Sequence, residues 1–322
     1  MGAAVSQQRF DLLWAVDEGQ VLGKGNVAVV YVCTQRCAPE KRYALKDLSA
    51  DLSDIAALNR MSEELRILKA LGCHKDIVSL VDSDDTRVGK MRLVLELCEG
   101  GVLHDRIQQL QRYPERDARS CCTNLVNAVA YIHSKGIMHR DIQLESILLA
   151  GTWSNSAVKI SGFGYAKVVR DFPKSLLWSR SVSGSDLYVA PEVLWQQSHG
   201  CEVDMWALGV VVYAMLSGLL PCGLLYKWHR QIVDGEIFGL PDQAWRHLSG
   251  GARDLIMRLL RPRASDRLTA AQALCHPWLR PPTPAHSSVV RSDSLLLRVG
   301  ECSLACSVGF PGSARTVGAT GR

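Results

Sequence analysis

The order of strand-like and helix-like segments constrains the fold of this chain more than any other feature. From about residue 10 to residue 98, short runs rich in Val, Leu and Tyr predict β-strands, and a single segment with apolar residues at helical spacing interrupts them. From about residue 99 to residue 280, the apolar spacing is that of helices. We therefore predict an α+β, bilobal fold, with a β-rich N-lobe (10–98) that holds one helix and an α-helical C-lobe (99–280).

Both ends of the chain differ from this core in composition. Residues 1–9 are polar and are expected to be loose, while residues 281–322 are rich in Ser, Gly and Pro, which is typical of a flexible tail. Within this tail only SLLLRV is apolar enough to dock. The start MGAAVS matches the pattern for N-myristoylation at Gly2, although so short a pattern also arises by chance. Because one acyl chain binds a bilayer only marginally, membrane association is expected only if Gly2 is acylated.

The composition argues against several classes of protein. With 47% apolar and 21% charged residues and a net charge of +5, the chain has the composition of an ordinary soluble protein, and no nucleic-acid partner is expected. Its 11 cysteines include no CxxC pair and the N-terminus has no apolar signal segment, so we expect a reduced, cytoplasmic location. The uncharged run 205–226 is long enough to span a bilayer. Ser217, Gly218, Pro221 and Gly223 interrupt it, which predicts a buried helix of about three turns instead.

Three features of the N-lobe suit phosphate binding. Glycines in the segment VLGKG, residues 21–25, would let backbone N–H groups approach phosphates closely, although a hairpin turn is the commoner cause of such a pattern. Lys46 ends the strand-like run RYALK about twenty residues later, and Glu64 lies on the predicted helix. A Lys46–Glu64 pair would hold the ammonium against nucleotide phosphates. The alternative is a solvated lysine on an edge strand and an ordinary surface carboxylate.

The loop His139-Arg140-Asp141 carries the strongest sign of catalysis. It follows a long predicted helix and precedes the apolar run 147–149, and Asp141 could accept a proton from a substrate hydroxyl. His139 is better explained as a packed, hydrogen-bonded residue than as a base. Arg140 could bind a phosphate or carboxylate from another loop. Further along, Glu192 and Arg267 are expected to form a buried structural ion pair rather than a catalytic one.

Together these motifs resemble those of a known enzyme family. GKG, YALK, the Glu64 helix, HRD, SGFG, APE, DMWALG and SDRLTAAQALCHPWL follow one another in the order and spacing of the eukaryotic protein kinases, and the resemblance covers residues 10–280. The opening FDLL…VLGKG and the ending HPWL are similar to the calcium/calmodulin-dependent kinase group. SAVKISGFG is similar to the CaM-kinase-like domain of the calcium/calmodulin-dependent serine kinase scaffold, which also has glycine in that turn, although this chain shows no scaffold domains.

The resemblance implies an ATP site, a Ser/Thr protein substrate and a set of site residues. It implies Asp141 as the catalytic residue and an internal apolar column formed by Leu68, Leu80, His139 and Phe163. The implied nucleotide-binding residues run from the glycine-rich loop through the N-lobe sheet to the segment between the lobes; they are Val21, Leu22, Gly23, Lys24, Gly25, Val30, Ala44, Lys46, Glu64, Leu95, Glu96, Cys98 and Leu148.

The sequence departs from the family pattern at the phosphate end of the site. Ala28 stands in place of the third loop glycine, Gln143 in place of the phosphate-contacting Lys, Ser146 in place of the Asn that holds a second metal ion, and Gly162 in place of the metal-binding Asp. We therefore expect no metal-binding residues and ATP bound without magnesium. The expected protein is a pseudokinase or a weakly active, metal-independent Ser/Thr kinase; the alternative is a catalytically dead scaffold or allosteric binding module.

Regulation is less constrained. A phosphate on one of the middle serines between Gly164 and Glu192 could pair with Arg140, although a flexible Ser-rich loop is the more common reason for such serines. Ser185 stands where the family has the Thr that aligns a substrate hydroxyl, and Val102 follows Gly100-Gly101 where an acid would favour basic substrates. Calmodulin would need a basic amphipathic helix after HPWL; three arginines diluted by PPTP and many serines make it a less favoured partner. The protein partner or substrate is not identified. The serines of the segment between Gly164 and Glu192 are Ser175, Ser179, Ser181, Ser183 and Ser185.

Overall fold

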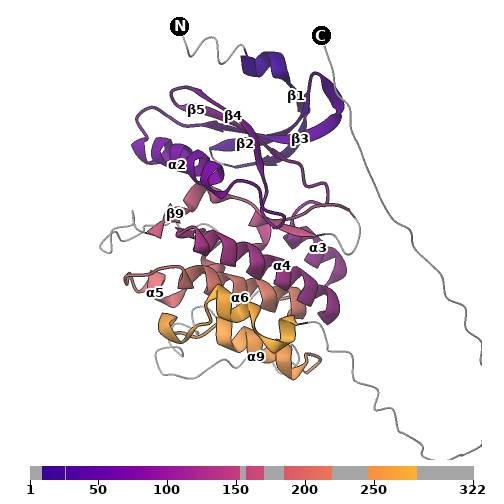
Figure 1. Cartoon of the computed structure of the whole chain (residues 1–322), viewed down its shortest axis with the longest axis vertical. Helices are drawn as coiled ribbons and strands as arrows, with labels where there is room; N and C mark the ends of the chain where they lie inside the picture. The colour runs from indigo at the N-terminus through magenta and orange to yellow at the C-terminus, as the bar shows by residue number, and fades with distance from the viewer. Residues whose placement is uncertain (1–8, 26, 153–156, 170–184, 220–245, 281–322) are drawn as a thin grey trace, which may run out of the picture. The chain divides into compact units, whose positions relative to one another are not determined.

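The structure is a computed structural model with one compact unit from Met1 to Pro281 and a second formed by residues 282–322, which lie outside the described part. As predicted, the strands of a sheet come first along the chain and most of the helices come afterwards (Figure 1). The residues that the structure describes are 9–25, 27–152, 157–169, 185–219 and 246–280.

The N-lobe is built on one antiparallel sheet of five strands in the order β1-β2-β3-β5-β4. In the register of this sheet Val30 pairs with Lys46, and Ala44 pairs with both Val32 and Leu95. Lys46 thus lies inside the central strand, which corrects our expectation that it ends a strand and excludes the alternative of an edge strand. The strands are β1 (Trp14–Lys24), β2 (Ala28–Gln35), β3 (Ala38–Ser49), β4 (Leu80–Arg87) and β5 (Lys90–Glu96).

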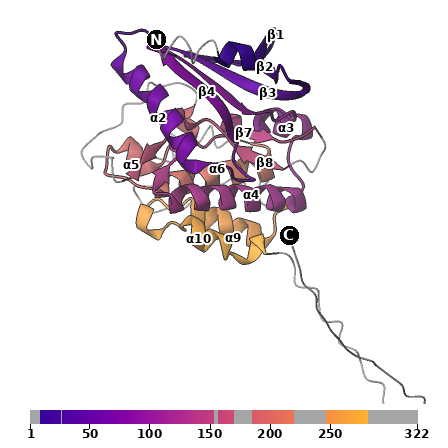
Figure 2. The ribbon, with the colours of Figure 1, turned by 45° about the horizontal axis from the view of Figure 1, so that its top comes forward.

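Helix α2 (Ile55–Leu71) is the single long helix of the described N-lobe and packs beside β4 (Figure 2). Asp54 caps its N-terminus by accepting a hydrogen bond of 2.9 Å from the N–H of Ala57. The buried face carries apolar residues at helical spacing, and Glu64 lies among them. This packing fixes the rotation of the helix and turns the Glu64 carboxylate toward the sheet.

The residues just before β1 cover one face of the N-lobe sheet. Residues 9–13 are helical, and the side chains of Phe10 and Trp14 are buried against Cys33, Leu45 and Val94. The indole N–H of Trp14 donates to Asp82 on β4 at 2.8 Å. Residues 1–8, which include the possible acylation site Gly2, lie outside the described part of the chain.

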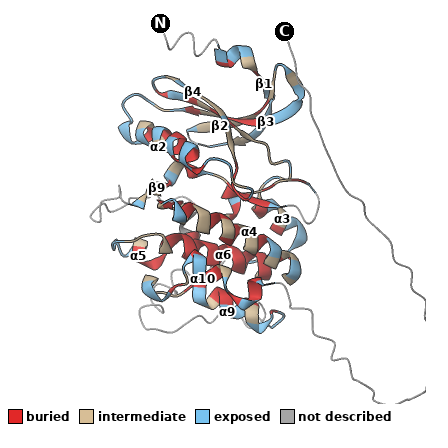
Figure 3. Cartoon of the chain, viewed as in Figure 1, coloured by how far each residue is buried: buried red, intermediate tan, exposed pale blue. Residues whose placement is uncertain are grey.

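The C-lobe is helical and is organised around α6 (Glu202–Ser217). Every residue of α6 from Val203 to Leu216 is buried, and the core of this lobe surrounds the helix (Figure 3). The apolar run 205–226 is therefore a buried helix as far as Ser217, while residues 220–226 lie outside the described part. Among the described helices none is long and apolar enough to cross a membrane. The other C-lobe helices are α3 (Leu103–Leu110), α4 (Glu115–Ser134), α5 (Pro191–Leu194), α9 (Gly250–Leu259) and α10 (Ala270–Leu274).

Four short strands lie on the N-lobe side of α4 and carry the loops of the candidate site. They pair in two antiparallel ribbons, with Ile147 opposite Ile160 in one and Ile137 opposite Val168 in the other. Each ribbon holds one end of the loop 139–146 beside one end of the loop 161–166, so the two loops lie next to each other. The strands are β6 (Ile137–Met138), β7 (Ile147–Leu149), β8 (Val158–Ile160) and β9 (Lys167–Val168).

Candidate active site

Lys46 and Glu64 form the ion pair that their positions in the sequence predict. The Lys46 ammonium lies 2.5 Å from Glu64 Oε1, and the side chains are 18% and 3% exposed. Lys46 comes from β3 and Glu64 from α2, so the pair joins the sheet to the helix. Because the Glu64 carboxylate is buried, its charge depends on Lys46 for compensation.

The glycine-rich loop lies between β1 and β2. The N–H of Gly25 donates to the carbonyl of Ala28 at 2.8 Å, which closes the turn. Ala28 has no positive φ, so the missing third glycine imposes no strain there. Val21, Leu22 and Lys24, at the end of β1, are exposed, as is Gly25 after it, and Gly23 is half-buried.

The segment after β5 connects the lobes and contacts β7. The N–H of Gly100 donates to the carbonyl of Leu149 at 3.0 Å, and the N–H of Leu149 donates to that of Gly101 at 2.9 Å. A Cβ on Gly100 would lie 2.1 Å from the carbonyl oxygen of Gly151, so only glycine fits here. Through these contacts Leu148 pairs with Val102, beside this connection.

Leu95 and Glu96 end β5, and Cys98 follows in the connection. Leu95 lies opposite Ala44 in the sheet. The Cys98 thiol is partly buried, and this burial raises its pKa to about 11, against a smaller opposing effect of the Lys159 charge. Cys98 is therefore a neutral thiol at physiological pH. The predicted nucleotide residues of the sheet and of the connection thus line adjoining parts of one region.

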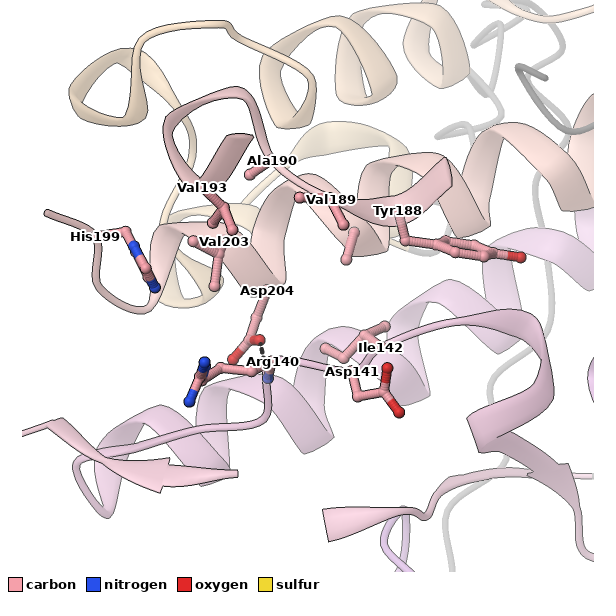
Figure 4. Close-up of a pocket in the computed structure, with 11 residues that line it drawn as sticks. Arg140, Asp141, Ile142, Tyr188, Val189, Ala190, Val193, His199, Val203 and Asp204 are labelled. Atoms are coloured by element: carbon pink, nitrogen blue, oxygen red, sulfur yellow. Dashed lines mark hydrogen bonds between the residues drawn. The ribbon is translucent and has the colours of Figure 1, made fainter. Parts of the chain in front are cut away.

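Asp204 on α6 holds the His139-Arg140-Asp141 loop in position. Its carboxylate accepts from the N–H of Arg140 at 2.8 Å (Figure 4). It also accepts from the N–H of His139 at 2.9 Å and lies 2.8 Å from His133 Nε2. Burial alone would raise the pKa of Asp204, but hydrogen bonds and the charge of His133 outweigh it and hold that pKa below its ordinary value. Arg140 adopts a φ of +66°, so this anchoring also offsets backbone strain.

Asp141 borders the pocket drawn in Figure 4, with its carboxylate directed away from the side chain of Arg140. Apolar side chains from Ile142, Val189 and Val203 line the same pocket. The side-chain amide of Gln143 donates to Asp141 Oδ2 at 3.3 Å. A carboxylate at the edge of a pocket can act as a general base when a hydroxyl comes within hydrogen-bond reach of it.

Ser146 satisfies its own loop. Its hydroxyl accepts from the N–H of Gln143 at 3.0 Å and lies 2.9 Å from the carbonyl of Asp141 and 3.0 Å from that of Gln143. The carbonyl of Ser146 accepts from both the N–H and the hydroxyl of Ser161, at 2.8 and 2.9 Å. These hydrogen bonds between Ser146 and Ser161 join the loop before β7 directly to the turn after β8.

Gly162 occupies the turn that follows Ser161. Its φ of +81° and ψ of +56° lie in the left-handed region, where glycine has no steric penalty. A Cβ at Gly162 would lie 3.5 Å from the Cβ of Ser146, and one at Gly164 would lie 3.5 Å from Glu64 Oε2. The turn therefore lies between the Lys46–Glu64 pair and the Asp141 loop, and it brings these two predicted parts of the site next to each other.

Packing around Phe163 matches the implied internal column. The rings of Phe163 and His139 meet edge to face with centroids 4.8 Å apart, and His139 Nε2 lies 2.9 Å from the carbonyl of Ser161. His139 is fully buried, which agrees with a packed residue and not with a base. Leu68 is buried and Leu80 is half-buried.

The predicted Glu192–Arg267 pair is present in the C-lobe. The guanidinium donates to both carboxylate oxygens, at 2.8 and 3.0 Å, and also to the carbonyl of Glu202 at 2.6 Å. Both residues are buried. The pair lies between α5 and the turn before α10, so it has a structural role.

Sequence reasoning missed two residues that organise the site. Asp204 lies in the motif DMWALG and was given no role. The loop that it contacts lies more than sixty positions earlier in the sequence. Lys159 was given no role within the motif SAVKISGFG, yet its ammonium lies 2.9 Å from Glu96 Oε1. A lysine flanked by two apolar residues in a short strand was the available signal.

Comparison with known proteins identifies the family. The family model described as "Protein kinase domain" matches residues 16–279. The chain belongs to the protein kinase family. Among curated proteins it is 38% identical over 269 residues to calcium-dependent protein kinase 15 of Oryza sativa subsp. japonica, which covers 81% of this chain and 47% of that relative. It is 35% identical over 278 residues to calcium-dependent protein kinase 7 of Arabidopsis thaliana, which covers 84% of this chain and 49% of the relative.

These similarities confirm the predicted bilobal kinase fold and the placement in the calcium/calmodulin-dependent kinase group. The chain is a Ser/Thr-type protein kinase domain related to calcium-dependent kinases. It spans about half the length of the curated relatives it matches. The similarity to the calcium/calmodulin-dependent serine kinase scaffold stays a prediction. The serines at 175–183 and the tail after residue 280 lie outside the described residues, and so does the side chain of Ser185.

Proposed function

We propose that this kinase domain binds ATP without magnesium and transfers its terminal phosphoryl group to Ser or Thr hydroxyls only slowly, or not at all. One observation carries the proposal. Gln143, Ser146 and Gly162, the three departures from the family pattern that bear on phosphate and metal, all adjoin Asp141 or its loop. They therefore change one place in the site, where the terminal phosphate would lie.

The donor atoms at this place do not fit a magnesium ion. Magnesium in nucleotide sites is held by carboxylate oxygens together with phosphates and water. Gly162 supplies no side chain, and the Ser146 hydroxyl is engaged by the backbone of its own loop. With glycine at position 162, no carboxylate there repels the phosphates of metal-free ATP. Weak binding of ATP without metal is therefore physically allowed.

Asp141 retains the means for a slow reaction. Its carboxylate accepts the proton of the substrate hydroxyl while the hydroxyl oxygen bonds to the terminal phosphorus and the bond to the ADP oxygen breaks. Losing one preorganised charge stabiliser costs ~10²–10³ in rate. From a typical kinase turnover of ~1–100 s⁻¹, three non-additive losses predict a rate below about 0.01 s⁻¹.

A second candidate function is a kinase-shaped binding module that transfers nothing. The intact Lys46–Glu64 pair and the packed His139–Phe163 contact favour it, because they maintain the fold without needing any chemistry. A phosphorylation activity that survives chelation and is lost in Asp141→Asn would support the slow enzyme. Absence of any transfer from a nucleotide-bound protein would support the module.

The remaining parts of the proposal concern context. The relatives are named calcium-dependent kinases, and from this we propose only that further parts of a longer protein regulate this domain. Calmodulin is a less favoured partner, because PPTP and many serines dilute the arginines of the sequence after HPWL. We propose a cytoplasmic location, with membrane attachment only if Gly2 is acylated. Intact mass of the protein from a eukaryotic host would reveal the acyl group.

The deciding experiment is thermal denaturation with ATP, once in EDTA and once in magnesium. The proposal expects ATP to raise the melting temperature in EDTA and magnesium to reduce that gain. Magnesium-dependent stabilisation alone would show that another acid holds the metal. No shift in either buffer, with a cooperative transition, would leave the binding module without nucleotide as the function.

A further inference from the structure

Lys159 is a buried cation that the kinase chemistry described above does not use. It lies on β8 and is 9% exposed. Its ammonium lies 2.9 Å from Glu96 Oε1 and donates to the backbone carbonyl of Lys75 at 2.8 Å. Burying an ammonium is unfavourable unless its partners compensate for lost hydration, so these two contacts explain how the charge is tolerated.

The two partners of Lys159 belong to different segments, and both segments are already held by backbone hydrogen bonds. The connection from α2 to β4 runs along β8, because the N–H of Ile160 donates to the carbonyl of Asp76 and the N–H of Val78 donates to that of Ile160, each at 2.9 Å. Glu96 ends β5, and its N–H donates to the carbonyl of Ser79 at 2.9 Å. Lys159 therefore lies where three segments of the chain meet.

The Glu96 carboxylate is fixed on both sides. Oε1 faces Lys159, and Oε2 accepts from the N–H of Ser79 at 3.4 Å. With both oxygens engaged, the carboxylate ties the end of β5 to the neighbouring connection. The backbone that follows, through Cys98, belongs to the segment between the lobes where the family resemblance implies nucleotide binding, and we take it as the end of the site that binds adenine.

Lys159 also adjoins that end directly. It is the cross-strand partner of Leu148, and directly opposed residues of an antiparallel pair stand on the same face. Its charge lowers the pKa of Cys98 against the larger effect of burial, which places it close to the connection between the lobes. In the other direction, β8 leads within three residues to Gly162. Lys159 thus links the adenine end of the site to the turn at its phosphate end.

We propose that Lys159 is a positioning residue for nucleotide binding, which holds Glu96 and the backbone after it in the geometry that adenine requires. The proposal rests on the proposed function, because it assumes that this region binds adenine nucleotides. It assigns to Lys159 no contact with the nucleotide. Its effect passes through Glu96, so removing either residue of the pair should have the same consequence.

The test measures the dissociation constant of adenosine in EDTA by calorimetry, together with the melting temperature of the free protein. Adenosine carries no phosphate, so it reports on the adenine end alone. We expect Lys159→Met and Glu96→Gln each to weaken adenosine about tenfold, which corresponds to about 1.4 kcal/mol. The double variant should bind about as well as either single variant, because the two side chains act as one unit.

Arg267→Met is the matched control. It also removes a buried cation from a carboxylate, that of Glu192, but it does so in the C-lobe core. It should lower the melting temperature and leave the adenosine affinity within about twofold of the wild type. If it weakened adenosine as much as Lys159→Met, general destabilisation would explain both and the proposal would be wrong.

Other outcomes separate the possible failures. Unchanged affinity in folded Lys159→Met, or effects that multiply to about a hundredfold in the double variant, would overturn the role of Lys159 while the nucleotide site stands. If Lys159→Met does not fold, the near-isosteric Glu96→Gln, at a side chain one-third exposed, decides the question alone. Failure of the wild type to bind adenosine would refute the nucleotide site, and this inference with it.

Discussion

Restoring a carboxylate at Gly162 is the sharpest perturbation of the proposed site. Gly162→Asp puts a carboxylate into the turn beside Ser146 and the Asp141 loop. The space exists, since an added Cβ would meet Ser146 Cβ at 3.5 Å, an ordinary van der Waals contact. The backbone is the cost: a left-handed conformation disfavours L-residues by ~1–2 kcal/mol, and Asp tolerates it better than most. For a domain of this size that predicts a melting temperature lower by about 2–8 °C.

The gain should be in chemistry and in metal dependence. A carboxylate that recruits magnesium to the terminal phosphates returns one charge stabiliser, which is worth ~10²–10³ in rate. We therefore expect Gly162→Asp to phosphorylate a Ser/Thr peptide mixture at least about tenfold faster in magnesium than in EDTA, whereas the wild type should be no faster in magnesium. The assay is transfer of radiolabelled phosphate, with thermal denaturation of the same samples.

Gly162→Asn is the control, because it has the shape and the left-handed tolerance of Asp without the charge. It should show the same loss of melting temperature and no response to magnesium. Equal magnesium responses of the Asp and Asn variants would refute the reasoning, and so would a wild type that is already activated by magnesium. Ser146→Asn by itself should destabilise the loop, because it breaks hydrogen bonds to the backbone of Gln143 and Asp141, each worth about 1 kcal/mol.

Three further predictions concern the pair, the base and the loop anchor. Lys46→Met should reduce the free energy of unfolding by ~3–5 kcal/mol in chemical denaturation, because buried Glu64 loses its cation; the double change to Lys46→Met with Glu64→Leu should recover much of that loss. Asp141→Asn should abolish transfer in EDTA while the shift of melting temperature by ATP persists. Since the folded pKa of Asp204 is depressed, its contribution to stability is complete above the unfolded value of about 3.9 and is lost as pH falls through the folded value; urea unfolding below pH 4 should show a steeper decline for the wild type than for Asp204→Asn.

Much of the fold follows from local patterns in the sequence. The period of the apolar residues predicts α2 and the buried helix α6, and β-branched runs predict the N-lobe strands. The Lys46–Glu64 and Glu192–Arg267 pairs were predictable because motif spacing placed them on facing elements. The position of Lys46 within the sheet was not, since strand order depends on pairings between residues distant in the sequence.

The contacts that sequence reasoning missed share one property. Asp204 holds backbone N–H groups of a loop, and Lys159 binds a backbone carbonyl and a carboxylate from two other segments. Partners of this kind carry no residue signature, because any loop offers N–H and C=O groups. Only the folded chain shows which charged side chain meets which backbone segment.

The structure also explains how a kinase domain could lose metal chemistry without losing its fold. The residues that agree with the family pattern, such as His139, Phe163 and Asp204, are buried and hold other segments in place. The departures at Ser146 and Gly162 are satisfied locally, one by hydrogen bonds within its loop and the other by a conformation that suits glycine. Because neither leaves an unpaired buried group, selection for stability alone would not oppose them. A site altered in this way would keep its architecture for binding while its catalysis declines.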